Sequence, residues 1–180
     1  NRPRRALERV RAPIVSARRA RQSRTMDRPS MEVALAGESR AAAFGAALAP
    51  ACRVGDVIAL RGDLGAGKTT LARGLIQALL GEAGAAEVPS PTFTLVQTYA
   101  TPRLTVWHFD LYRLEHAAEA RELGLDESAA GLCLIEWPER LGRDLPRARL
   151  DVDLSFSGEG RIARLTDHGD WSERLVGDWR

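Results

Sequence analysis

The stretch that decides the fold is Gly62-Asp63-Leu64-Gly65-Ala66-Gly67-Lys68-Thr69-Thr70. It matches the pattern G-x-x-x-x-G-K-[ST] of a phosphate-binding loop, or P-loop, which joins a strand to a helix. The glycines let backbone N–H groups approach phosphate oxygens without interference from a Cβ atom. Lys68 is expected to reach the β- and γ-phosphates and to act in catalysis, and the Thr69 hydroxyl to ligate Mg²⁺. We therefore predict that all nine residues form a nucleotide-binding loop.

The residues on both sides of this loop supply the elements that a P-loop requires. Residues 56–61 form a short apolar run, which indicates a buried strand. Leu71, Leu75 and Leu79 recur every four residues, which indicates a helix that stops at Gly81. The chain has 26 basic residues, and Lys68 is the only lysine among them. Lysine suits this position because its compact charge can pass between phosphates, where the planar fork of arginine would serve less well.

The remaining periodicities predict one α/β domain. Further strands are expected from apolar or alternating runs at residues 93–99, 104–109, 132–135, 150–156 and 161–166, and further helices at residues 38–48 and 115–130. The last two strands are joined by Ser157-Gly158-Glu159-Gly160, a turn that makes them a C-terminal β-hairpin. The predicted fold class is a single P-loop NTPase domain with a mixed central sheet flanked by helices.

Two carboxylates follow predicted strands at positions suited to a metal. Asp110 ends the strand 104–109, and Glu136 ends the strand 132–135. Both should emerge at the carboxyl edge of a parallel sheet, where the P-loop also opens. One acid would ligate Mg²⁺ directly or through water, and the other would orient water or complete the metal's shell. We therefore predict a metal site made by Thr69, Glu136 and Asp110, with Asp110 also catalytic.

The stretch Ser90-Pro91-Thr92-Phe93-Thr94 lies between the P-loop helix and the Asp110 strand. Nucleotide switches place a loop that senses the γ-phosphate at this point of the chain. Thr92 is a candidate catalytic residue, because its hydroxyl could sense the γ-phosphate or hold the attacking water. Trp137 is expected to stack near the nucleotide or a partner. His108 has no obvious partner in the sequence and is interpreted as structural.

The charge of the chain is divided unevenly. Residues 1–30 hold ten arginines against Glu8 and Asp27, a local net charge of +8, so residues 31–180 carry −6 of the total of +2. We interpret residues 1–30 as an Arg-rich leader outside the fold, either disordered or translated from upstream of a start at Met26 or Met31. A targeting arm or an RNA-binding tail is the alternative. Residues 31–180 are the predicted ATPase domain.

Composition excludes several classes of protein. No apolar run approaches the roughly 20 residues that a membrane span needs. Cys52 and Cys133 are far apart and show neither a disulfide framework nor the spacing of a zinc site. We therefore expect a cytoplasmic protein that does not associate with a membrane.

Several segments together resemble one family. These blocks are similar in order and spacing to the signatures of the TsaE family, also called YjeE: residues 62–70, Ser90-Pro91-Thr92-Phe93-Thr94-Leu95, His108-Phe109-Asp110-Leu111-Tyr112-Arg113 and Glu136-Trp137-Pro138. The resemblance implies a bacterial cytoplasmic ATPase, with ATP and Mg²⁺ as cofactors, needed for threonylcarbamoylation of adenosine 37 in tRNA. It also implies TsaD and TsaB as protein partners, and contact with tRNA only through their complex. Slow hydrolysis in the absence of these partners is expected.

The resemblance also assigns roles to individual residues. Lys68 would grip phosphates, Thr69 and Glu136 would ligate Mg²⁺, and Asp110 would assist the metal or the water. Thr92 would belong to the switch-like loop, and Trp137 would lie near the nucleotide. By their place in the family pattern, Ser39 in the first helix and Arg161 in the hairpin are expected on the adenine and phosphate sides of the ligand.

Two other functions fit a P-loop. A small-molecule kinase would need a second substrate pocket and usually a lid, for which residues 81–88 are too short. A nucleotide-dependent switch without significant catalysis is the other alternative. Guanine-specific switches generally read the base with Asn-Lys-x-Asp, and the only lysine here lies in the P-loop. ATP is therefore expected rather than GTP.

Overall fold

The computed structural model describes residues 30–82 and 88–175. The predicted leader lies outside the described residues except for Ser30, which begins the first strand. Residues 83–87, within the segment considered for a kinase lid, and residues 176–180 also lie outside them.

Seven strands and several helices make up the described part of the chain. The strands are β1 (Ser30–Leu35), β2 (Val57–Arg61), β3 (Val96–Ala100), β4 (Thr105–Asp110), β5 (Leu132–Glu136), β6 (Leu150–Ser157) and β7 (Gly160–Asp167). The α-helices are α1 (Gly37–Leu48), α2 (Lys68–Leu80), α3 (Glu119–Glu122) and α4 (Trp171–Arg174). Short 3₁₀ segments are η1 (Ala49–Ala51), η3 (Glu127–Ala130) and η4 (Pro138–Asp144).

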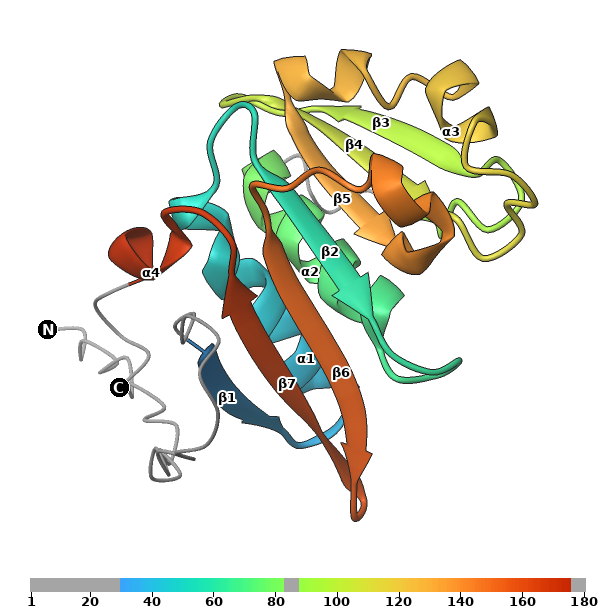
Figure 1. Ribbon diagram of the computed structural model, residues 1–180. Helices are drawn as coiled ribbons and strands as arrows, with labels where there is room; N and C mark the ends of the chain where they lie inside the picture. The colour runs from blue at the N-terminus through green and yellow to red at the C-terminus, as the bar shows by residue number, and fades with distance from the viewer. Residues whose placement is uncertain (1–29, 83–87, 176–180) are drawn as a thin grey trace, which may run out of the picture.

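All seven strands form one mixed sheet in the order β1-β7-β6-β2-β5-β4-β3 (Figure 1). The centre is parallel, because β2 pairs with both β5 and β6, and β5 pairs with β4. The edges are antiparallel, through β3 on one side and the β6–β7 hairpin with β1 on the other. The parallel pairing brings the carboxyl ends of β2, β4 and β5 to one edge of the sheet.

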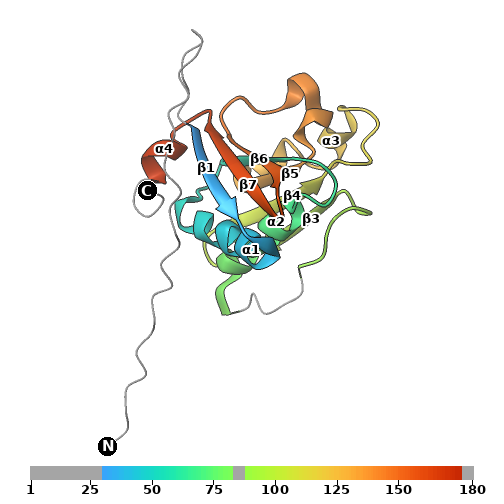
Figure 2. The same cartoon turned by 90° about the horizontal axis from the view of Figure 1, so that it is seen from below.

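Helices α1 and α2 cover one face of this sheet, as Figures 1 and 2 show. The main core lies between them and the strands, and its buried side chains include Phe44, Leu71, Leu75 and Ile58. The two helices approach closely at Gly45 of α1 and Gly74 of α2. A Cβ atom on Gly45 would lie 2.0 Å from the carbonyl oxygen of Leu71. Small residues are thus required where the P-loop helix crosses α1.

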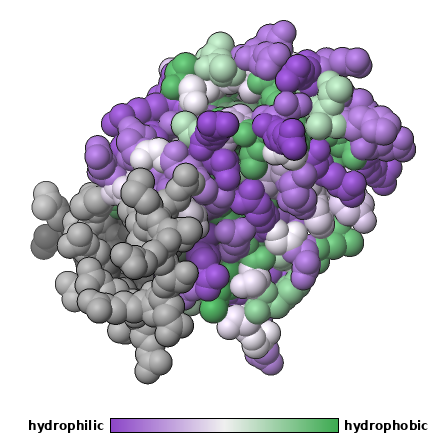
Figure 3. Space-filling model, viewed as in Figure 1, coloured by the Kyte–Doolittle hydropathy of each residue, from purple (hydrophilic) through white to green (hydrophobic). Residues whose placement is uncertain are grey.

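The other face is covered only over part of its area. Leu141 of η4, with Phe109 and Ile135, belongs to a second apolar cluster over β4 and β5. Over β6 a network of charged side chains takes the place of apolar ones, around the buried carboxylate of Asp151. Asp151 pairs with Arg61 at 2.8 Å, and it also pairs with Arg149 and His168. Figure 3 shows that this side of the molecule is largely hydrophilic where coloured atoms are seen.

The fold class is confirmed, and so are the P-loop context and the C-terminal hairpin. Two predicted elements were wrong in extent. The strand expected at 93–99 begins only at Val96, because Leu95 has φ of 64° and belongs to a turn. The helix expected at 115–130 is two short pieces, α3 and η3, separated by a turn in which Gly124 has φ of 90°. Strand β1 and helix α4 were not predicted.

The two cysteines are not joined, as expected from their spacing. Cys52 and Cys133 are both free and buried. Burial raises the pKa of each thiol to about 12, so neither is a reactive thiolate at neutral pH. Within the described ranges, no helix is long and apolar enough to cross a membrane.

We predict that Gly45→Ala destabilises the protein, although alanine is normally the better helix former. The new Cβ atom would clash with the backbone of α2, so the free energy of unfolding should fall by about 1–3 kcal/mol. Gln77→Ala, on the exposed side of α2, is the control and should change stability by less than about 0.5 kcal/mol. Urea denaturation of both variants measures the difference. A Gly45→Ala protein as stable as the wild type would contradict the packing described.

A candidate nucleotide-binding site

The P-loop has a backbone that depends on its glycines. Gly62, Gly65 and Gly67 have φ of 134°, 79° and 104°, values that residues with a Cβ atom adopt at a cost. At Gly62 a Cβ atom would also lie 2.4 Å from the carbonyl oxygen of Leu154. Helix α2 begins directly after Gly67, with a first backbone bond from Leu71 N to Gly67 O of 3.0 Å. The amides before that bond, together with the helix dipole, make this end of α2 suited to an anion.

Lys68 is held in a defined position at the start of α2. Its Nζ atom donates to the carbonyl oxygens of Gly62 at 2.6 Å and Asp63 at 2.9 Å. It also lies 3.9 Å from the ring centroid of Trp137, and Tyr112 packs on that ring with centroids 4.9 Å apart. The side chain is only 5% exposed. Desolvation lowers the pKa of Lys68 from its ordinary value, with nearby carboxylates opposing the shift.

Trp137 owes its place over Lys68 to an unusual backbone. Its φ of 60° and ψ of 50° are left-handed, a conformation rarely adopted by a bulky residue. This turn ends β5 and starts η4. Glu136 and Trp137 thus both face the P-loop from the end of one strand.

Glu136 links the P-loop helix to the sheet. One carboxylate oxygen, Oε2, accepts a hydrogen bond of 2.8 Å from Thr69 Oγ1. The other, Oε1, lies 2.8 Å from His108 Nε2. His108 therefore has a partner, contrary to what the sequence indicated. The Thr69–Glu136 contact is the pairing expected of two groups that share one metal site.

Asp110 is the register partner of Glu136 on the adjacent strand. Its Oδ2 atom accepts a hydrogen bond of 2.7 Å from Thr92 Oγ1, and its Oδ1 atom accepts one of 3.1 Å from Tyr112 N. Ser90 Oγ lies 2.7 Å from Thr92 Oγ1. The predicted switch-like loop is thus fastened to the second carboxylate. These contacts bring together Asp110 and Thr92, two residues that the sequence analysis proposed separately as catalytic.

One cleft unites most of the predicted site residues. It is lined by Glu38, Leu64, Gly65, Gly67, Lys68, Thr69, Thr70, Thr92, Asp110, Tyr112, Glu136, Trp137 and Arg161. Gly62, Asp63 and Ala66 belong to the same loop but do not line this cleft. Ser39 is exposed on α1 and does not line it either, whereas its neighbour Glu38 does. Tyr112 and Glu38 are cleft residues that the sequence did not indicate.

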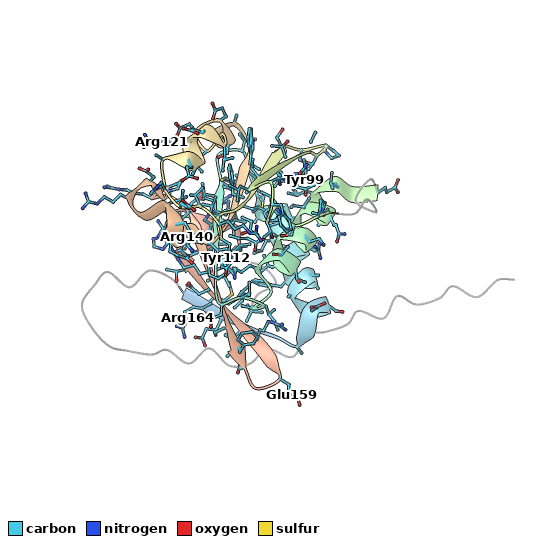
Figure 4. The ribbon with its side chains drawn as sticks, turned by 90° about the vertical axis from the view of Figure 1, so that its right-hand side faces the viewer. Tyr99, Tyr112, Arg121, Arg140, Glu159 and Arg164 are labelled. Carbon is cyan, nitrogen blue, oxygen red and sulfur yellow. The ribbon has the colours of Figure 1, made fainter. Side chains whose placement is uncertain are left out.

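Arg161 reaches the P-loop from the β6–β7 hairpin, whose tip is marked by Glu159 in Figure 4. Its Nη2 atom donates to Gly65 O at 3.0 Å, and its side chain lies 3.6 Å from the position of a Cβ atom on Gly67. The buried Nε atom of Arg161 has no hydrogen-bond partner within the described structure. A donor left over beside the loop fits an anionic ligand.

The oxygen donors also fit Mg²⁺. This cation prefers hard oxygen ligands and is usually held by one or two carboxylates together with substrate phosphates and waters. Thr69, Glu136 and Asp110 supply such oxygens. In residues 30–82 and 88–175 no group of three or more His, Cys, Asp or Glu side chains is arranged to hold a metal. Mg²⁺ bound through these oxygens would usually share its coordination with substrate phosphates and waters.

Comparison with known proteins decides the family. A family model described as "Threonylcarbamoyl adenosine biosynthesis protein TsaE" matches residues 35–164. The chain belongs to the TsaE family. A TsaE protein of Rickettsia bellii is 40% identical over 69% of this chain and 86% of its own length. A TsaE protein of Haemophilus influenzae is 41% identical over 67% of this chain and 75% of its own length.

A solved structure confirms the assignment at the level of the fold. YdiB of Bacillus subtilis aligns with a TM-score of 0.70 and 30% identity, over 84% of this chain and 94% of that chain. Membership of the TsaE family places the chain among P-loop nucleotide-binding proteins of threonylcarbamoyladenosine biosynthesis in tRNA. The resemblance of residues 62–70, 90–95, 108–113 and 136–138 to this family is therefore confirmed.

We predict that Lys68→Ala weakens ATP binding at least 100-fold, because it removes a buried ammonium whose charged hydrogen bonds are worth about 1.5–3 kcal/mol each. Lys68→Arg keeps the charge but has a planar fork, so it should bind more weakly than the wild type and more tightly than the alanine variant. Isothermal calorimetry with ATP measures the three affinities. Wild-type affinity in a folded Lys68→Ala protein would refute the site.

Proposed function

We propose that this chain is a Mg²⁺-dependent ATP hydrolase, slow by itself, whose turnover supports threonylcarbamoylation of adenosine 37 in tRNA with TsaD and TsaB in the cytoplasm. The observation that carries this proposal is the hydrogen bond between Thr69 and Glu136 beside Lys68. It joins the two oxygen donors expected for Mg²⁺ to each other, next in the chain to the one ammonium expected for phosphate. Family membership supports the proposed part in threonylcarbamoylation of tRNA. The contacts in the cleft support the proposed Mg²⁺-dependent hydrolysis of ATP.

The contacts in the cleft support a proposed role for several of its residues. Lys68 would hold the phosphates, and Thr69 and Glu136 would hold Mg²⁺, which when bound neutralises charge on the phosphate oxygens. Asp110 is a carboxylate kept in place by Thr92 and by the backbone of Tyr112. It is the group placed to orient an attacking water, either directly or through the Thr92 hydroxyl.

The surface around the cleft supports a protein partner. Five large hydrophobic side chains are exposed among the described residues, and four of them either line the cleft or adjoin a residue that does: Leu64, Phe93, Tyr112 and Phe156. Leu64 and Tyr112 line the cleft, Phe93 follows Thr92, and Phe156 packs on Arg161. Phe93 is 82% exposed, with Arg113 stacked on its ring. Exposed apolar groups concentrated in this way mark interaction surfaces.

We predict that Glu136→Ala lowers Mg²⁺-dependent ATP hydrolysis by at least about 100-fold and metal-free ATP binding by less than threefold. The physical reason is that Glu136 would contact the metal, whereas the loop and Lys68 would contact the phosphates. Phosphate release measures the first quantity and calorimetry in EDTA measures the second. An equal loss of both would point to misfolding and contradict the assigned role.

We predict that the partner pair TsaD–TsaB stimulates ATP hydrolysis, and that Phe93→Ser and Phe156→Ser reduce this stimulation. Both changes remove apolar contact area at the mouth of the cleft while leaving basal hydrolysis within about twofold, as surface substitutions generally do. Val54→Ser is the matched control, because Val54 is 59% exposed and, unlike Phe93, is not next in the chain to a residue that lines the cleft. Phosphate transfer to a small metabolite, without stimulation by the pair, would favour a kinase instead.

The proposed role in tRNA modification can be tested in cells with the Lys68→Ala variant. Cells depleted of this protein should lose threonylcarbamoyladenosine from their tRNA, and wild type should restore it. Lys68→Ala should not restore it if ATP turnover is required. Rescue by that variant at normal protein levels would separate the tRNA function from the ATP site.

A further inference from the structure

We propose that His108 is a positioning residue for Glu136, holding its carboxylate in the orientation that Mg²⁺ requires. This inference rests on the proposed function, because His108 has this role only if Glu136 binds a metal ion. His108 is fully buried on β4, two residues before Asp110. It does not line the cleft, so it is separated from any ligand by Glu136 itself.

The contact defines the state of the imidazole. A carboxylate oxygen accepts hydrogen bonds, so the 2.8 Å contact requires that His108 Nε2 carry hydrogen and donate to Glu136 Oε1. The Nδ1 atom has no hydrogen-bond partner within the described structure. In the neutral tautomer with hydrogen on Nε2, Nδ1 is only an unused acceptor, which costs less than a buried donor without a partner. Among the residues that the structure describes, the single polar contact of this ring is therefore its bond to Glu136.

The burial of His108 is difficult to explain by packing alone. Its register partner on β5 is Leu134, and Val106 lies two residues earlier on the same face of β4; both are part of the main apolar core. An apolar side chain would fill this position without burying an imidazole that has one unused nitrogen. A role for the Nε2–H group accounts for a polar ring at this depth.

Glu136 is thereby tethered from two different elements. Thr69 on α2 holds Oε2, and His108 on β4 holds Oε1. The Thr69 tether belongs to the helix that would carry the phosphates, whereas the His108 tether belongs to the sheet. Hydrogen bonds from such supporting groups commonly fix the orientation of metal ligands, and their loss costs about 10–100-fold in metal affinity. Without His108, the carboxylate would keep the tether to Thr69 on α2 but lose the one to the sheet.

Three variants separate this role from packing. His108→Leu removes the donor. His108→Gln places an amide N–H near the position of Nε2, so it can still reach Oε1. His108→Asn carries the same amide on a side chain one methylene shorter, which cannot reach. Folding is checked by circular dichroism and thermal melting before any comparison.

The measurement is calorimetric binding of ADP to the full chain, in EDTA and across a titration of Mg²⁺. His108→Leu and His108→Asn should raise the Mg²⁺ concentration for half-maximal enhancement of binding by about tenfold. His108→Gln should raise it by less than about threefold, and all three should bind metal-free ADP within about twofold of the wild type. A purely structural role would not produce this split between Gln and Asn.

Two results would overturn the proposal. One is a folded His108→Asn protein with the Mg²⁺ response of the wild type, and the other is an equal shift in the Gln and Asn variants. If His108→Leu fails to fold, the Gln and Asn pair decides the question by itself. A wild-type protein that binds ADP equally with and without Mg²⁺ would overturn the proposed function as well, whereas a normal wild-type response limits any failure to His108.

Discussion

The parallel pairing of β2, β5 and β4 is the constraint on which the site depends. Strand β5 lies between the strand that leads into the P-loop and the strand that ends at Asp110. Its register sets Glu136 opposite Leu60 on one side and opposite Asp110 on the other. A slip of β5 by one residue would turn Glu136 to the opposite face of the sheet, away from α2 and Thr69. Residues 132–135 of β5 are all apolar and would be equally suited to burial after such a slip. The register must therefore be held by the neighbouring elements.

The electrostatic design of the cleft follows from that geometry. The only lysine of the chain lies between loop carbonyls, an aromatic ring and two carboxylates at strand ends. Low exposure strengthens each of these interactions, since charges in a dry site are less screened than charges in water. Thr69 and Thr92 each tie one carboxylate to a different segment. The P-loop helix and the 90–94 loop are therefore both attached to the same edge of the sheet.

Much of this site could be predicted from sequence because its key residues lie in short motifs. The P-loop pattern fixes Lys68 and Thr69, and an acid after an apolar strand is visible at Asp110 and Glu136. His108 could have been found by the alternation of β4, which puts it on the same face as Asp110. The partner of His108 could not be found in this way, because the contact with Glu136 depends on the pairing of β4 with β5. The sequence of neither strand specifies the register between them.

The errors in the fold have similar causes. Residues 115–130 contain good helix formers, but Gly124 at positive φ breaks them into two short pieces. Strand β1 is an edge strand whose pairing with β7 is a tertiary contact, and local pattern alone does not reveal it. Ser39 and Glu38 are neighbours on α1, and only the rotation of that helix against α2 decides which of them meets the cleft.

The left-handed backbone of Trp137 is strained, and the contacts of its ring with Lys68 and Tyr112 depend on that backbone. A bulky residue in that conformation costs about 1–3 kcal/mol, and glycine would adopt it without strain. Glycine, however, would leave Lys68 Nζ and Tyr112 without the ring that lies against both. The ring also packs against the second apolar cluster, and truncation of a packed aromatic side chain costs about 3–5 kcal/mol, more than the strain that glycine would relieve. The rigid wall beside the ammonium is therefore held in place by the same packing that offsets its strained backbone.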